Sequence, residues 1–379
     1  MRIPERLLLG PGPSPVSPRV MQAMASPVIS HLDPAMMALL DDLRERLGAA
    51  FGAGDGAFSF AVSGTGTSGM EAAVANVTRP GMRALVVVSG YFGDRLAQML
   101  ERYGATVSRV AVEWGRACDP DQIARALSAE RSDLVAMVHA ETSTGVVNPI
   151  EEMLAVSRTH GALTIVDAVT SLGAVPLRTG RWDADVCYSC TQKGLGAPSG
   201  LAPITFSARA LQARAPSRSF YLDLSLLEDY WLRRKYHHTI SAPLVFALHE
   251  AVAAAQEEGM EARWERHRAN HLALARGLDA LGLSLLPPEA ERLWTLNAVR
   301  VPDGVDEAAV RRRLLDEFSI EIGAGLGPLA GRIWRVGLMG SGSTLANVLL
   351  FLTALEHVLR KSGYRGGSAS TAVAAAESV

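Results

Sequence analysis

One lysine, Lys193, stands in the run CTQKGLGAPSG, residues 190–200, among residues that are mostly small. A lysine at the mouth of a parallel sheet, partly desolvated and near another cation, can have its pKa lowered enough to attack a carbonyl group. Two other interpretations are open from this stretch alone. Lys193 could be a surface lysine on a glycine loop, or part of a redox or metal motif with Cys187 and Cys190.

The cysteine spacing favours a structural role. Cys187 and Cys190 fall in the last turns of a predicted strand, whereas a thioredoxin-like pair opens a helix, so we interpret both as small buried hydrophobes. Cys118 follows no pattern that suggests a role. Three cysteines are too few and odd in number for a disulfide framework, which suits a reducing compartment and predicts a cytoplasmic protein.

A buried carboxylate is the second candidate. Asp167 ends the apolar run in TIVDAVTSLG, residues 164–173, which predicts a strand buried on both faces. A carboxylate there is costly unless it meets a positive charge or several donors. It could cap a following helix, or it could keep the pyridine nitrogen of a cofactor protonated.

The third candidate is a phosphate seat in AVSGTGTSGMEAAVANV, residues 61–77, where a strand enters a Ser/Thr/Gly loop and then a helix. Its backbone N–H groups can converge on an anion, and Thr65, Thr67 and Ser68 add hydroxyl donors at the positive end of the helix dipole. The glycine spacing fits neither the dinucleotide fingerprint nor a P-loop. A simple capped helix is the competing interpretation.

The bulk composition limits the partners. The chain has 379 residues, 48% of them hydrophobic, with 37 basic against 39 acidic side chains and no long run of one sign. This balance gives no electrostatic footprint for nucleic acid or an anionic membrane. No apolar run approaches the roughly 20 residues that a membrane-spanning helix needs.

The chain order of strands and helices predicts an α/β fold: a three-layer sandwich with a mostly parallel central sheet, plus a smaller α+β C-terminal domain. The predicted strands begin at residues 83, 133, 162, 184 and 201, with helical stretches between them. We expect an extended N-terminal arm (1–16), a large domain (17–258), a small domain (259–365) and a disordered tail (366–379).

Phosphate seat, aspartate and lysine, in this order at the carboxyl ends of strands, meet the three needs of pyridoxal 5′-phosphate (PLP). The chain resembles the class V aminotransferases of fold type I, within them the alanine–glyoxylate and serine–glyoxylate group. The resemblance runs from LLLGPGPSP through SGTGTSGMEAAVANV, IVDAVTSLG, CTQKGLGAPSG and KYHHTIS to GLGPLAGRIWRVGLMG. It implies PLP as cofactor.

The resemblance also implies roles for individual residues. Lys193 would attach the cofactor covalently, and Asp167 would bind its pyridine nitrogen. The family's phosphate ligands match Thr65, Gly66, Thr67 and Gln192. Its ring-stacking aromatic matches Phe92, and the hydroxyl at the cofactor's phenolic oxygen matches Thr142.

Other family motifs imply substrate contacts and a partner. Tyr236 and Thr239 in KYHHTIS would reach across a two-fold axis to the partner's phosphate, which implies a homodimer with shared active sites. Arg335 would bind the substrate carboxylate with its planar fork. His31 is a further substrate-side candidate. We expect no metal site, because neighbouring histidines on a strand point to opposite faces.

The implied function is a ping-pong transfer of an amino group from a small L-amino acid, alanine or alternatively serine, to glyoxylate or another keto acid. Two alternatives within the family are a ureidoglycine–glyoxylate and a 3-hydroxykynurenine aminotransferase. Related ureidoglycine enzymes carry amide residues where His31 and Tyr236 stand here, which argues against that donor. A PLP-dependent lyase or desulfurase, or a relative that binds PLP without catalysis, would be a different class.

Overall fold

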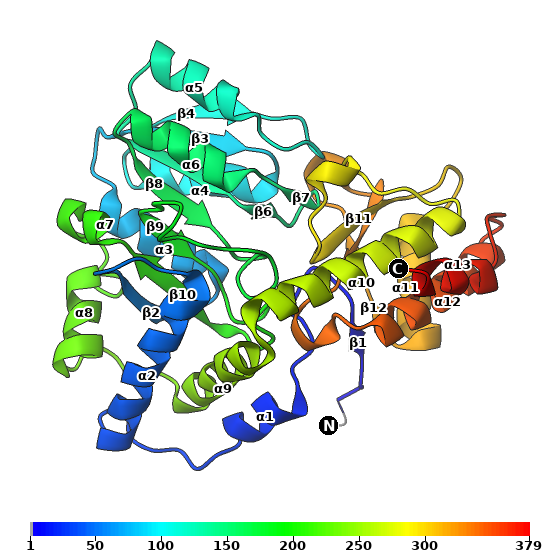
Figure 1. Ribbon diagram of the computed structural model, residues 1–379, viewed down its shortest axis with the longest axis horizontal. Helices are drawn as coiled ribbons and strands as arrows, with labels where there is room; N and C mark the ends of the chain where they lie inside the picture. Colours follow the sequence, from blue (N-terminus) through cyan, green and yellow to red (C-terminus); the bar gives the residue numbers. More distant parts are fainter. Residues whose placement is uncertain (1–2) are drawn as a thin grey trace.

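A seven-stranded sheet with the order β2-β10-β9-β8-β5-β3-β4 dominates the computed structural model, which describes residues 3–379 (Figure 1). All its strands run parallel except β10, which is antiparallel to both neighbours. The predicted α/β class with a mostly parallel sheet is confirmed. The strands are β2 (Phe58–Gly64), β3 (Arg83–Val88), β4 (Thr106–Ala111), β5 (Leu134–Val138), β8 (Leu163–Asp167), β9 (Val186–Tyr188) and β10 (Gly200–Phe206).

The reversed strand corrects one expectation, since the apolar run from 201 was expected to be parallel. Residues 189–199 join β9 to β10 without a helix, and parallel neighbours need a crossover of a dozen or more residues. The short loop therefore turns the chain back antiparallel. The same loop carries Lys193.

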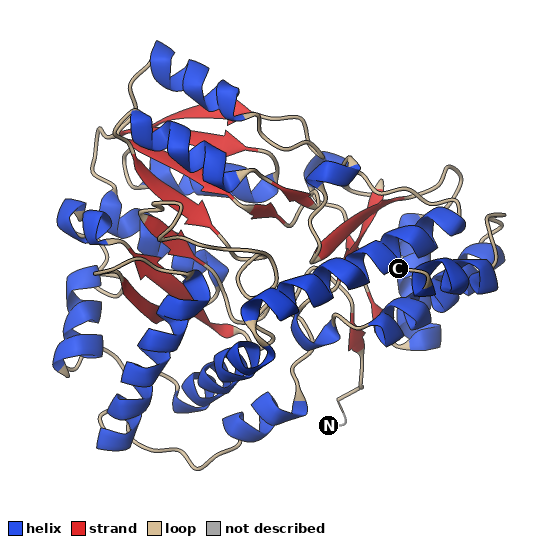
Figure 2. Ribbon diagram, viewed as in Figure 1, coloured by secondary structure: helices blue, strands red, loops and turns tan. Residues whose placement is uncertain are grey.

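Helices cover both faces of the sheet and make the three layers (Figure 2). Helices α3 (Gly66–Val77) and α4 (Tyr91–Arg102) lie on one face, and α5 (Pro120–Ala129) and α6 (Ile150–Thr159) on the other. Right-handed crossovers require this division, because the chain moves outward from β2 to β4 and then returns through β5 to β8. The other helices of this part are α1 (Pro18–Met24), α2 (Pro34–Phe51), α7 (Ala208–Ala213), α8 (Leu224–Arg233) and α9 (Ala242–Glu258).

The C-terminal part is built on a three-stranded antiparallel sheet, β11-β14-β13. Its apolar cluster is separate from that of the seven-stranded sheet. The chain bends at Gly259 between α9 and α10, so the predicted division at 258/259 coincides with a turn. The elements are α10 (Met260–Ala280), β11 (Leu296–Arg300), α11 (Glu307–Phe318), β12 (Ile320–Glu321), β13 (Gly323–Ala324), β14 (Ile333–Gly337) and α12 (Leu345–Lys361). Among the described helices none is long and apolar enough to cross a membrane.

The C-terminal tail differs from its prediction. Residues Ala369–Glu377 form helix α13, which packs against α10 and α12 instead of being disordered. Ser368 caps its first turn by accepting from the Thr371 N–H. The helix buries only alanines, Ala372 and Ala376. Small side chains allow a close approach between helices, so a lack of bulky apolar residues was a poor sign of disorder here.

The N-terminal arm runs extended over both parts of the chain. Strand β1 (Leu7–Leu8) pairs in parallel with β12, and Leu9 is buried in the C-terminal apolar cluster. Residues 1 and 2 of the predicted arm lie outside the described residues. Further along, the backbone N–H of Ser14 donates to the Gln192 carbonyl at 2.9 Å, so the arm reaches the lysine loop.

Candidate active site

A cavity of about 160 Å³ lies at the carboxyl ends of the parallel strands. Strand β8 ends with Asp167, and the loop after β9 brings Lys193 to the same place. The lining includes eight of the ten residues predicted to contact a cofactor: Thr65, Gly66, Thr67, Phe92, Thr142, Asp167, Gln192 and Lys193. The fold therefore brings together residues that are up to 128 positions apart, from Thr65 to Lys193.

Asp167 is buried, with 2% of its surface exposed, and burial raises its pKa to about 6. Two donors oppose this rise: the Val169 N–H and the Tyr188 hydroxyl, each at 2.8 Å from a carboxylate oxygen. Turns rather than a helix follow Asp167, so a role as helix cap is wrong. A carboxylate has about four lone-pair sites, which leaves acceptor capacity for a further donor in the cavity.

Lys193 is held under the N-terminal arm. Its ammonium donates to the Pro11 carbonyl, and the Ser14 hydroxyl donates to the Lys193 carbonyl at 2.9 Å. Burial lowers the pKa of Lys193, and the positive charge of Arg335 lowers it further. A Cβ atom on Gly12 would lie 2.5 Å from the Lys193 Nζ, and Gly12 has φ +110°, so only glycine fits at this point of the arm.

The predicted phosphate seat is the N-terminus of α3. Its first residues, Gly66 and Thr67, present backbone N–H groups at the positive end of the helix dipole. A Cβ on Gly66 would lie 2.9 Å from the Val169 side chain, so glycine keeps this approach possible. Thr65 and Thr67 are exposed, and the cavity is therefore open at this end.

Arg95 lines the same end of the cavity and was missed by the sequence analysis. Its guanidinium lies 5.1 Å from the centre of the Phe92 ring, and Nη1 donates to the Thr67 hydroxyl at 3.3 Å. The signal was present: Arg95 follows Phe92 by three positions on α4, and such residues share a helix face. Arg95 adds a positive charge beside the helix N-terminus.

Thr142, which lines the cavity, directly follows Glu141, the last residue of β6 (Ala140–Glu141). The hydroxyls of Thr142 and Thr170 are hydrogen-bonded to each other. Glu141 is fully buried, and its carboxylate accepts from the Ser143 hydroxyl at 2.6 Å and from the Gly93 N–H at 3.3 Å. Burial raises the pKa of Glu141. This carboxylate was also missed, since HAETSTG offers no spacing that separates it from a surface glutamate.

Arg335 comes from the middle of β14 and lies next to the Thr142 segment. Nε donates to the Ala324 carbonyl at 2.6 Å, and Nη1 donates to the Thr142 carbonyl at 3.3 Å. Only 8% of Arg335 is exposed, and burial lowers its pKa to about 10, with Glu141 opposing the change. Arg332 is exposed, as the sequence predicted.

Three predicted site residues lie away from this cavity. The Tyr236 side chain is 64% exposed and Thr239 is exposed as well. His31 packs against Tyr236 with 5.4 Å between ring centres, so it belongs with the exposed segment and not with Lys193 of its own chain. Within residues 3–379, no three His, Cys, Asp or Glu side chains are grouped as metal ligands.

All three cysteines are free and buried, which agrees with the interpretation of Cys187 and Cys190 as small apolar residues. Cys190 lines the cavity, but burial raises its pKa to about 12 and keeps the thiol protonated. Burial likewise raises the pKa of Cys187 and that of Cys118, the latter to about 11. None has the character of a reactive thiolate.

Known proteins share both the sequence and the fold. Residues 7–335 match the family described as Aminotransferase class-V. An alanine–glyoxylate aminotransferase of Drosophila melanogaster is 36% identical over 95% of this chain and 94% of its own length.

Two solved structures are similar over nearly the whole chain. Ureidoglycine–glyoxylate aminotransferase from Bacillus subtilis superposes with a TM-score of 0.97 at 40% identity, covering 100% of this chain and 98% of that one. Alanine–glyoxylate aminotransferase from Nostoc sp. gives 0.92 at 46% identity, covering 95% and 97%. This chain belongs to the class V aminotransferase family, as its sequence motifs had indicated.

Proposed function

We propose that this chain is a PLP-dependent aminotransferase that moves an amino group from a small L-amino acid, alanine with serine as second choice, to glyoxylate. The observation that carries the proposal is the grouping of the Lys193 amine, the Asp167 carboxylate and the α3 N-terminus around one cavity. The names of the Drosophila and Nostoc relatives support alanine and glyoxylate as the substrate pair.

The residues present fit PLP. Asp167 has acceptor capacity for a protonated ring nitrogen, and the aromatic residue Phe92 lines the cavity. The Gln192 Oε1 atom is buried without a hydrogen-bond partner, which leaves it available for a ligand donor. The N-terminus of α3, with Thr65, Gly66 and Thr67, would hold the phosphate.

When bound, PLP would carry the amino group between the two substrates and draw electron density from the substrate α-carbon. The chain's own residues do the rest. The Lys193 amine takes the proton from the α-carbon of the amino donor. In the second half of the reaction it gives a proton to the α-carbon of the acceptor, and its lowered pKa favours this role. Asp167 keeps a negative charge next to the cofactor nitrogen. Arg335 holds the substrate carboxylate, and the keto acid leaves before glyoxylate enters.

We also propose a homodimer that shares its active sites. The cavity is open at Thr65 and Thr67, where the phosphate would lie, while Tyr236 and Thr239 are exposed and lie away from the cavity of their own chain. A two-fold partner would bring these side chains to the open end. A cytoplasmic location stays a prediction, and the three free cysteines are compatible with it.

The test is an absorbance spectrum of the purified protein, recorded before and after L-alanine and then glyoxylate. We expect a cofactor band near ~420 nm that falls with alanine and returns with glyoxylate. The Lys193→Ala variant is the control and should lack the band. If wild-type protein reconstituted with PLP shows no such band, the proposal is wrong.

Ureidoglycine is the second candidate donor, favoured by the likeness to the Bacillus subtilis enzyme. The same spectrum separates the two donors. A band that alanine and serine leave unchanged, but that ureidoglycine lowers, would select the second function and keep the chemistry.

A further inference from the structure

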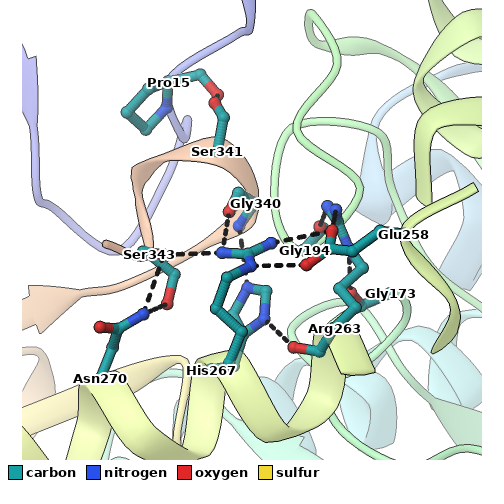
Figure 3. Close-up of polar contacts among 11 residues, drawn as sticks. Pro15, Gly173, Gly194, Glu258, Arg263, His267, Asn270, Gly340, Ser341 and Ser343 are labelled. Atoms are coloured by element: carbon teal, nitrogen blue, oxygen red, sulfur yellow. Dashed lines mark hydrogen bonds and ion pairs between the residues drawn. The ribbon is translucent and has the colours of Figure 1, made fainter. Parts of the chain in front are cut away.

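A partly buried network connects the start of α10 to the loop that carries Lys193 (Figure 3). Arg263 is 6% exposed, and its guanidinium donates from Nε to the Gly173 carbonyl at 2.7 Å and from Nη2 to the Gly194 carbonyl at 2.8 Å. Gly194 directly follows Lys193, and Gly173 lies within the turns that follow Asp167. One side chain thus joins the two segments that bear the reacting groups.

Glu258 fixes the orientation of that guanidinium. Its carboxylate accepts from Arg263 Nη1 at 2.7 Å and from Arg266 Nε at 2.6 Å. Arg266 in turn donates from Nη1 to the carbonyls of Ser343 and Gly340, at 2.6 and 3.2 Å. We call Glu258, Arg263 and Arg266 the α10 clamp. Arg263 donates to the lysine loop and to the turns after Asp167, and Arg266 donates to the 340–343 turn. Both arginines also donate to the Glu258 carboxylate.

The turn at 340–343 also touches the lysine loop. A Cβ on Gly340 would lie 2.9 Å from the Gly196 Cα and 3.4 Å from the Lys193 carbonyl, so the two backbones are in contact. His267 fixes this turn, because its Nε2 accepts from the Gly340 N–H at 3.1 Å. Its Nδ1 must then carry the proton and donates to the Arg263 carbonyl at 2.7 Å. Burial lowers the pKa of His267 to about 3, which keeps the ring neutral.

The lysine loop has little regular structure of its own. Its described backbone bonds within the loop are the Gly196 N–H to the Lys193 carbonyl at 3.0 Å and the Ala197 N–H to the Thr191 carbonyl at 3.0 Å. The buried carbonyls of Gly173 and Gly194 have Arg263 as their one donor among the described contacts. Removing it would leave both acceptors buried and unpaired, which is unfavourable.

We propose that Arg263 is a positioning residue for the Lys193 amine, with Glu258 setting its orientation, whereas Arg266 holds the turn that follows β14. The inference rests on the proposed function, in which Lys193 moves a proton and Arg335 on β14 holds the substrate. Proton transfer requires donor and acceptor at hydrogen-bond distance, and small displacements cost large factors in rate. The clamp thus fixes the place of Lys193 relative to the strand that carries Arg335.

The first test needs neither cofactor nor activity. Amide hydrogen exchange is measured by mass spectrometry on cofactor-free wild type, Arg263→Lys and Arg266→Lys. Lysine keeps the positive charge beside Glu258, but its single nitrogen replaces three guanidinium nitrogens that each reach a different acceptor, on Glu258, Gly173 and Gly194. Arg263→Lys should speed exchange in peptides covering 191–197 by about tenfold, equivalent to about 1.4 kcal/mol. Arg266→Lys, the matched control, should speed exchange in 340–347 and change 191–197 by no more than about twofold.

Peptides from β5 and β8 report global unfolding and correct for an overall loss of stability. Unchanged exchange at 191–197 in Arg263→Lys overturns the proposal, and so does equal acceleration there in both variants. Because no PLP is present, a failure of the proposed function leaves this test intact.

A second readout separates positioning from mere stabilisation. In PLP-loaded protein, Arg263→Lys should lower kcat by about tenfold with little change in KM, and should displace the pH midpoint of the absorbance band. Arg266→Lys should keep that midpoint. A midpoint that is the same in wild type and Arg263→Lys would contradict a role in placing the lysine amine.

Discussion

The two ends of the candidate site are held in opposite ways. At the inner end, Asp167 and Lys193 are enclosed by their own chain, with partners from strands, the N-terminal arm and α10. At the outer end, Thr65 and Thr67 are exposed, and Tyr236, the residue predicted to reach a partner's outer end, is exposed elsewhere on the chain. The inner end is complete in one chain and fits the chemical step. The outer end is exposed to solvent, which supports the proposal that residues of a second copy of the chain cover it.

The comparison predicts the largest loss at the inner end. Lys193→Ala should lower the rate of transamination by at least about 10⁴-fold, because it removes both the cofactor attachment and the proton carrier. Steady-state assays with alanine and glyoxylate measure this. Folding should be preserved, as circular dichroism can verify. Activity within tenfold of wild type would mean that another group moves the proton.

Asp167 gives a pH signature in cofactor-free protein. Its folded pKa is raised from 3.8 to about 6 by burial, so the folded state binds the proton more tightly than the unfolded state. The corresponding stability is present below about pH 4 and is lost as the pH rises to about 6, up to about 3 kcal/mol in total.

Urea unfolding at several pH values checks this prediction against Asp167→Asn, which keeps the shape but cannot titrate. The difference in unfolding free energy between the two proteins should change across this window. A constant difference from pH 4 to 7 would rule the explanation out. With PLP bound, a protonated ring nitrogen should stabilise the carboxylate and flatten the dependence.

Arg335 is the proposed contact between the inner end and the substrate carboxylate. Arg335→Lys keeps a cation but loses the planar fork, so KM for alanine should rise by about 10- to 100-fold while the absorbance band of the bound cofactor is retained. Arg332→Lys is the matched control on the same strand region and should change little. A KM unchanged in Arg335→Lys would remove this residue from substrate binding.

The smallest effect is expected at the outer end. Tyr236→Phe removes one hydroxyl and should weaken PLP binding by about two- to tenfold, the value of a single neutral hydrogen bond. Equilibrium dialysis of the cofactor measures it.

Mixed dimers test whether the two chains share their active sites. A Tyr236→Ala/Thr239→Ala chain combined with a Lys193→Ala chain should regain one intact site per mixed dimer if sites are shared. If each chain were self-sufficient at the outer end, mixing would restore no cofactor affinity.

Sequence patterns predicted the inner end well because its residues sit at the ends of strongly apolar strands. The strand that ends at Asp167 and the loop after β9 could both be predicted from local composition, so Asp167 and Lys193 could be placed at one edge of the sheet. Tyr188 was missed although it donates to Asp167, since its partner lies on the next strand and only the register reveals the pair. Arg263 was missed for the same reason: α10 shows a charged pattern, and its contacts are long-range.

The chain ends were harder to predict, and for different reasons. The Gly/Pro content of the arm showed that it forms no regular helix, but not which surface it covers. The tail was expected to be disordered because it lacks large apolar side chains, yet its alanines pack closely onto α10 and α12. Propensity and composition describe local preference, whereas close packing of small residues depends on the partner surface.

The arm has a practical consequence for anyone who prepares this protein. Pro11 and Ser14 bond to Lys193, and Gly12 leaves no room for a side chain beside its amine. Trimming the first fifteen residues as dispensable would therefore uncover the Lys193 amine, and a fusion partner joined close to this segment would press on the same place. An affinity tag is better carried beyond α13, where Val379 is exposed.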